Sequence, residues 1–126
     1  MEQNEVMFFE DSRFYGSETF YRTTLLRSLV ATEGIKYMFD TLACYWVGDF
    51  VMTCLPVLSK LLDSAGTFFV VKVVRNENNS ATLTVDDGNE NFILSKHIQY
   101  TDLSQNLKFY LIYDTVRWTM LLPSEY

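Results

Sequence analysis

The run Thr67-Phe-Phe-Val-Val-Lys-Val-Val-Arg75 gives the clearest indication of the fold. Its β-branched and aromatic residues favour an extended strand, and because its first half is apolar on both faces, we expect a central strand of a sheet. After a turn over residues 76–79, residues 80–86 alternate apolar and polar side chains, which predicts a strand with one buried face. Asp87 and Gly88 then supply residue types that adopt positive φ in a tight hairpin. This part of the chain therefore predicts two neighbouring strands and the turn into a third.

The rest of the C-terminal half continues with the two-residue period that strands show. Three more runs of this kind, bounded by turn residues, are residues 91–101, 107–113 and 116–122. Together with the two strands above, they predict an antiparallel meander of about five strands over residues 67–122.

Before this region the apolar period is that of a helix. One helical face is formed by residues at i, i+3, i+4 and i+7: Ile35, Met38, Phe39 and Leu42. Thr32 is a suitable N-cap, so we predict a helix from about residue 33 to residue 42. A second apolar stripe predicts a helix over about residues 45–62, which Pro56 kinks or divides.

The pattern is weaker near the N-terminus. Residues 1–13 suit a short amphipathic helix, and residues 20–26 fit a strand, although residues 23–30 could also begin a helix. No repeat, low-complexity tract or linker interrupts the chain. We therefore predict an α+β fold in a single domain over residues 1–126, with the helices packed on one face of the antiparallel sheet.

The composition is that of an acidic chain rich in aromatic residues. The 126 residues, about one ordinary domain, include 10 Lys plus Arg and 16 Asp plus Glu, which gives a formal net charge of −6. That charge argues against a surface that binds nucleic-acid phosphates directly. With 48% hydrophobic residues, and with 10 Phe, 8 Tyr and 2 Trp, the chain is too apolar for a disordered acidic tail.

Residues 41–62 are apolar over about the 20 residues that cross a bilayer. Asp49 lies near their middle, and because a carboxylate at the bilayer centre costs about 2.5–3.5 kcal/mol, we expect a buried helix and no membrane contact. Cys44 and Cys54 lie in the same segment and would be about 15 Å apart on one helix, beyond disulfide reach. They predict free core thiols in a reducing cytoplasm, and the N-terminus lacks the features of a secretory signal.

The sequence contains none of the common catalytic or phosphate-binding motifs. A zinc site needs three or four ligands, whereas the chain has one His and two Cys. A catalytic dyad or triad would have to use His97, which falls on the polar face of a predicted strand and is expected to be solvated or hydrogen-bonded. We therefore predict no enzyme activity, no metal and no cofactor.

Four acidic residues lie in or beside the predicted turns: Glu77, Asp86, Asp87 and Glu90. Their spacing lacks the pattern of a calcium-binding loop, so one interpretation is that they are solvated turn residues. The other is a partner-binding surface on which carboxylates and exposed tyrosines compete for a basic nucleic-acid groove. There, charge complementarity would set the orientation and the association rate.

A second group of candidate residues is associated with the predicted helices: Arg22, Tyr37, Tyr45 and Asp49. A carboxylate on an apolar helix needs a partner, so Asp49 is expected in a buried salt bridge or hydrogen bond that orients the helices. The alternative is a pocket in which these residues bind a small polar ligand, such as a nucleotide signal.

Five phrases of the sequence carry a family resemblance: Phe14-Tyr-Gly-Ser-Glu-Thr-Phe-Tyr-Arg22, Thr32-Glu-Gly-Ile-Lys-Tyr-Met38, Cys44-Tyr-Trp-Val-Gly-Asp49, Ile98-Gln-Tyr-Thr-Asp102 and Leu121-Leu-Pro-Ser-Glu-Tyr126. In this order they resemble an uncharacterised domain family of phages, prophages and other bacterial genomes, with phrases F-x-G-x-x-x-Y-Y-R, T-D-G-[IV]-x-Y-L, A-Y-W-L-x-D, Y-T-D and L-P-S-E-Y. The resemblance implies a small cytoplasmic protein, often of phage or mobile-element origin, and it brings no known reaction.

We therefore expect a non-enzymatic protein that binds and inhibits a bacterial defence complex in the host cytoplasm, in the manner of an anti-CRISPR protein. The expected target is a protein or nucleoprotein complex such as a CRISPR effector, with no direct binding of nucleic acid. The alternatives are a protein that sequesters a small ligand or nucleotide signal, and a structural accessory protein that forms a homodimer.

Overall fold

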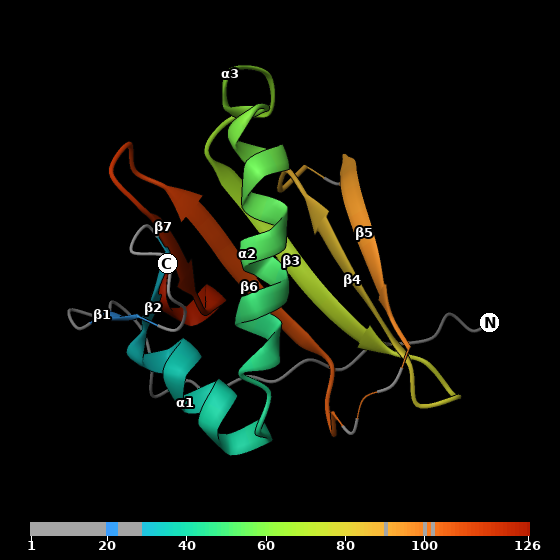
Figure 1. Ribbon diagram of the computed structural model, residues 1–126. Coiled ribbons are helices and arrows are strands. Elements are labelled where there is room, and N and C mark those ends of the chain that lie inside the picture. Colours follow the sequence, from blue (N-terminus) through green and yellow to red (C-terminus); the bar gives the residue numbers. More distant parts are fainter. Residues whose placement is uncertain (1–19, 23–28, 90, 100, 102) are drawn as a thin grey trace.

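Figure 1 shows the computed structural model of the chain, which describes residues 20–22 (backbone only), 29–89, 91–99, 101 and 103–126. These residues form an α+β fold with a mixed seven-stranded sheet in the order β1-β2-β7-β6-β3-β4-β5. The strands are β1 (Phe20–Arg22), β2 (Leu29–Thr32), β3 (Phe68–Arg75), β4 (Ala81–Asp86), β5 (Phe92–Ile98), β6 (Leu107–Tyr113) and β7 (Trp118–Leu121). The helices are α1 (Glu33–Leu42), α2 (Trp46–Ser59), α3 (Leu62–Ala65) and the 3-10 helix η1 (Pro123–Glu125).

The predicted central strand is confirmed, because β3 pairs antiparallel with both β4 and β6. Its alternate residues Phe69, Val71 and Val73 are fully buried on the side of the sheet that α2 crosses (Figure 1). The core there is one apolar cluster with side chains from α1, α2 and each strand from β2 to β7. The other side of β3 carries the half-buried Phe68 and Lys72, so this second face of the sheet has polar as well as apolar side chains.

The predicted meander is wrong, because consecutive strands are not neighbours throughout the sheet. β6 pairs with β3, and β5 is the edge strand beside β4. Burial explains this order: β6 buries Leu107, Phe109 and Leu111 completely, whereas β5 is exposed at Phe92, Ser95 and His97. A strand rich in buried residues is stabilised most at the centre of a sheet, where both of its edges are paired.

Two strands before the first helix extend the sheet beyond the five that we predicted. β2 is buried at all four positions and pairs parallel with β7, which makes the sheet mixed, while β1 pairs antiparallel with β2. The strand predicted over residues 20–26 is confirmed at β1, and the helical alternative over residues 23–30 is wrong at its last two residues, which belong to β2. The remainder of that segment, and the helix predicted over residues 1–13, lie outside the described residues.

The first predicted helix is confirmed with its bounds, and Thr32 caps it by accepting the backbone N–H of Ile35 at 3.4 Å. The helix predicted over residues 45–62 corresponds to α2 and the start of α3, with Pro56 inside α2. Both cysteines are buried free thiols. Over the described ranges, no helix has the length and apolar character required to cross a membrane.

Candidate binding surfaces

Two carboxylates lie on the β4–β5 hairpin and are held by hydrogen bonds within the turn. Asp86 Oδ1 accepts the backbone N–H of Gly88 at 2.8 Å. The Asp87 carboxylate accepts the backbone N–H groups of Asn89 at 2.9 Å and of Asn91 at 3.2 Å, and the side-chain amide of Asn91 at 2.9 Å. The Asn91 amide, followed by the Asn89 N–H, lowers the pKa of Asp87 because these donors stabilise its charged form. Asp87 is therefore a negative charge in a fixed position.

The structure separates Glu77 from these two carboxylates. Glu77 is exposed in the β3–β4 turn, at one end of β4, whereas Asp86 and Asp87 lie at the other end. The six residues of β4 span about 20 Å at roughly 3.4 Å per residue. The predicted acidic surface therefore excludes Glu77 and is reduced to the hairpin, and Glu90 lies outside the described residues.

Three aromatic rings pack together next to this hairpin, on the face of the sheet opposite α2. The ring centroids of Phe68 and Tyr110 are 4.8 Å apart, and Tyr126 lies 5.3 Å from the first and 5.5 Å from the second. Tyr126 is 76% exposed. A Cβ atom at Gly88 would lie 2.9 Å from the Phe68 ring, which places the hairpin against the cluster. Phe92, the register partner of Asp86, is 66% exposed.

Two carboxylates and four aromatic side chains together form what we call the hairpin surface: Asp86, Asp87, Phe68, Phe92, Tyr110 and Tyr126. Sequence reasoning found its two carboxylates from the turn pattern. It did not find the ring cluster, because Phe68, Tyr110 and Tyr126 meet through the pairing of β6 with both β3 and β7. The one local signal for Phe68 is that the first half of residues 67–75 is apolar on both faces, which indicates an aromatic side chain on each side of the strand.

Two lysines lie directly opposite each other on the same face as the ring cluster. Lys72 of β3 and Lys108 of β6 are register partners, and both are half-buried. They line a cavity of about 200 Å³ with Phe68, Val70, Asp86, Gly88 and Tyr110. We call this the lysine pocket. Like charges directly opposite on neighbouring strands destabilise a sheet, so the pair is an unfavourable arrangement in the free protein.

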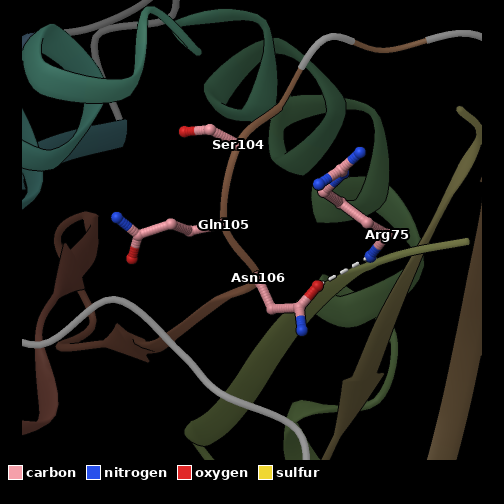
Figure 2. A pocket seen from close by; sticks show the side chains of 4 residues that line it. All are labelled: Arg75, Ser104, Gln105 and Asn106. Atoms are coloured by element: carbon pink, nitrogen blue, oxygen red, sulfur yellow. Dashed lines mark hydrogen bonds between the residues drawn. The ribbon is translucent and has the colours of Figure 1, made fainter.

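A polar hollow at the far end of β3 is shown in Figure 2, where Arg75, Ser104, Gln105 and Asn106 line about 370 Å³. Asn106 Oδ1 accepts the backbone N–H of Arg75 at 2.8 Å. Ser104 and Gln105 point away from the Arg75 guanidinium (Figure 2). A neighbouring hollow of about 570 Å³ includes Arg75, Glu77 and the exposed His97. Since the side chains in Figure 2 diverge, this region is a weaker candidate for a binding site.

The predicted ligand pocket includes Arg22, Tyr37, Tyr45 and Asp49. Tyr37 and Tyr45 are 36% and 41% exposed, and the backbone of Arg22 in β1 pairs with that of Val30 in β2. The prediction of a buried Asp49 is wrong, since this residue is exposed on α2. The apolar stripe of α2 faces the core and leaves Asp49 on the solvent side.

The Tyr45 hydroxyl instead donates a hydrogen bond to Asp40, which also pairs with Lys36 at 3.0 Å. The bond from Tyr45, followed by that from Lys36, lowers the pKa of Asp40. Sequence reasoning missed Asp40 as the partner of Tyr45, although the two residues flank the end of α1. This exposed group links α1 to the start of α2.

A buried carboxylate joins two of the phrases that carry the family resemblance. Glu125 is 5% exposed and accepts the Thr32 hydroxyl at 2.5 Å and the backbone N–H groups of Gly34 at 3.0 Å and Leu122 at 2.9 Å. It therefore lies at the N-terminus of α1, where the helix dipole favours a negative charge. A Cβ atom at Gly34 would lie 2.7 Å from Glu125 Oε1. These residues thus have a structural role in the fold.

The geometry defines an α+β protein whose sheet has a helix-covered face and a second face with aromatic rings, carboxylates and paired lysines. A family model described as "Family of unknown function (DUF6876)" matches residues 11–126, and the chain belongs to this family. The resemblance to an uncharacterised domain family is confirmed at that level. Neither a curated protein nor a solved structure matches the chain. Among the residues that the structure describes, no group of three or more His, Cys, Asp or Glu side chains could hold a metal ion.

Proposed function

We propose that the protein is a non-enzymatic binding protein of phage or mobile-element origin that inhibits a bacterial defence complex in the host cytoplasm. The observation that carries the proposal is the hairpin surface, where exposed aromatic rings lie next to fixed carboxylates. The target is a basic, nucleic-acid-binding site on a protein or nucleoprotein complex such as a CRISPR effector, so the protein acts in the manner of an anti-CRISPR protein.

The aromatic part of the surface supports protein contact. Phe92 and Tyr126 are 66% and 76% exposed, although large aromatic side chains are usually buried. Exposed aromatic residues are enriched at interfaces because they bury a large area at a low cost in side-chain entropy. The rings of Phe68 and Tyr110 pack against the ring of Tyr126. This packing orients the Tyr126 side chain before a partner binds.

The charge of the chain supports a basic partner. The formal net charge is −6, and the turn hydrogen bonds keep Asp87 ionised and oriented. A negatively charged surface accelerates encounter with a basic groove and fixes its orientation there. The assignment to a defence complex rests on the family phrases, since the surface itself selects only for positive charge.

The test is affinity capture from bacteria that express a CRISPR effector, with the wild-type protein as bait. Asp86→Asn/Asp87→Asn is the informative variant, because each Asn keeps an oxygen acceptor for the turn while two charges are removed. Glu77→Gln is the matched control, since Glu77 is an exposed acid in the β3–β4 turn, at the opposite end of β4 from the hairpin. Capture of a nucleic-acid-processing complex by the wild type and the control, and its loss with the double variant, supports the proposal. Capture of no such complex, or equal capture by all three proteins, overturns it.

A further inference from the structure

We propose that the lysine pocket binds the phosphoryl group of a mononucleotide, with the base against the ring cluster of Phe68, Tyr110 and Tyr126. This inference goes beyond the proposed protein–protein contact and rests on a different observation, which is the Lys72–Lys108 pair. The ligand class follows from three features of the pocket: its charge, its size and its aromatic rim.

The charge of the pocket selects an anion. Lys72 and Lys108 are direct cross-strand partners, and within the described part of the chain neither ammonium has a carboxylate at ion-pair distance. Asp86 also lines the pocket, but one oxygen of its carboxylate accepts the Gly88 N–H. Two lysines and one aspartate leave one net positive charge in a chain of net charge −6. An anion between the lysines would remove the repulsion that they exert on each other.

The size of the pocket selects a small anionic group. Its volume is about 200 Å³, which is below the range of roughly 300–1,000 Å³ for cavities that enclose a whole drug-sized ligand. A phosphoryl group with its hydrogen-bonded waters fits this space, whereas the remainder of a nucleotide must lie outside it. Lysine is a common phosphate ligand, since its ammonium acts as a point charge with three donors.

The rim of the pocket determines what the rest of the ligand contacts. Phe68 and Tyr110 belong to the pocket lining. Both rings also pack against the ring of Tyr126, which is 76% exposed. Nucleobases stack on aromatic side chains irrespective of base identity. A ligand with a phosphoryl group at one end and a flat aromatic base at the other therefore matches both parts of the surface.

The experiment is a titration of the full chain, followed by amide chemical shifts, with the four 5′-mononucleotides, their nucleosides and inorganic phosphate. We expect mononucleotides to bind at least about tenfold more tightly than nucleosides or phosphate, and Lys72→Gln/Lys108→Gln to lose at least about tenfold in affinity. Lys60→Gln is the control, because Lys60 is exposed at the end of α2, and it should bind as the wild type does. Equal affinity for mononucleotide and nucleoside, equal affinity for mononucleotide and phosphate, or unchanged binding by the double variant would overturn the proposal.

The single variant Asp86→Asn separates this inference from the proposed function. Removal of the carboxylate from the pocket should tighten the binding of a mononucleotide, because it removes a charge that repels the phosphoryl group. The same variant should weaken capture of a basic protein partner. The two proposals therefore predict opposite changes in affinity for the same variant and can fail separately. Weaker mononucleotide binding by Asp86→Asn would contradict the inference, whatever the result of the capture experiment. A thermal melt of Lys72→Gln/Lys108→Gln, expected at or above the wild-type temperature, verifies that its loss of binding is not a loss of fold.

Discussion

Glu125→Ala is the substitution with the largest predicted effect on stability. It removes a buried acceptor from three donors: the Thr32 hydroxyl and the backbone N–H groups of Gly34 and Leu122. A buried donor left without a partner costs about 1–3 kcal/mol. Water can enter the space vacated by the side chain, so we take the lower end for each donor. The expected loss in the free energy of unfolding is about 3 kcal/mol.

Urea denaturation measures this loss. With a slope of about 1–3 kcal/mol per molar urea for a small domain, the midpoint should fall by roughly 1–3 M. Glu77→Ala is the matched control, since Glu77 is exposed in a turn, and its effect should stay within about 0.5 kcal/mol. A loss below about 1 kcal/mol for Glu125→Ala would refute the assignment of this carboxylate as the buried acceptor at the N-terminus of α1.

A double-mutant cycle tests the same contact from its other side. Thr32→Ala should cost about 0.5–2 kcal/mol, because Thr32 is the N-cap of α1 as well as a donor to Glu125. Since the two side chains share a hydrogen bond, the double variant should be less destabilised than the sum of the single variants. Full additivity would indicate that the two side chains do not interact.

Three further predictions follow from the charges and the burial. Lys108→Glu should raise the free energy of unfolding by about 0.2–1 kcal/mol, because it places an opposite charge next to Lys72; a lower urea midpoint would contradict this. Burial raises the pKa of Cys44 to about 12 and raises the pKa of Cys54 as well, so iodoacetamide at about pH 8 should modify neither thiol in the folded protein and both in urea. The pKa of Asp87 is lower in the folded than in the unfolded chain, so its contribution to stability is present above the unfolded value, near 4, and is lost as pH falls through the folded value. Asp87→Asn should flatten the acid limb of stability against pH, and an unchanged limb would count against the turn hydrogen bonds.

The sequence predicts correctly the elements whose caps, turns and apolar spacing lie within one short segment of the chain. The first helix has its N-cap at Thr32 and its apolar spacing within eleven residues, so its bounds were predicted correctly. The run from Thr67 to Arg75 predicted a central strand because its composition requires burial on both faces. The order of the other strands could not be predicted in this way, because β5 and β6 both read as strands and only their packing decides which one lies beside β3.

The residues of the candidate surfaces also differ in whether local sequence could predict them. Asp86 and Asp87 were found from a turn pattern that covers a few residues. The Lys72–Lys108 pair depends on the register between two strands that are far apart in the sequence, and the hydrogen bond between Thr32 and Glu125 joins residues 93 positions apart. Asp49 was misplaced because a helical stripe predicts an apolar face, but not how much of the remaining circumference the neighbouring elements cover.

Displacement of nucleic acid is the sharpest test of the proposal that the hairpin surface blocks a basic nucleic-acid site. A captured complex is loaded with fluorescently labelled guide or target nucleic acid and titrated with the protein, followed by anisotropy. We predict that the wild type and Glu77→Gln displace the label, whereas Asp86→Asn/Asp87→Asn requires at least about tenfold more protein, equivalent to about 1.4 kcal/mol. A protein that binds the complex while the nucleic acid stays in place, or equal displacement by the double variant, would contradict the claim.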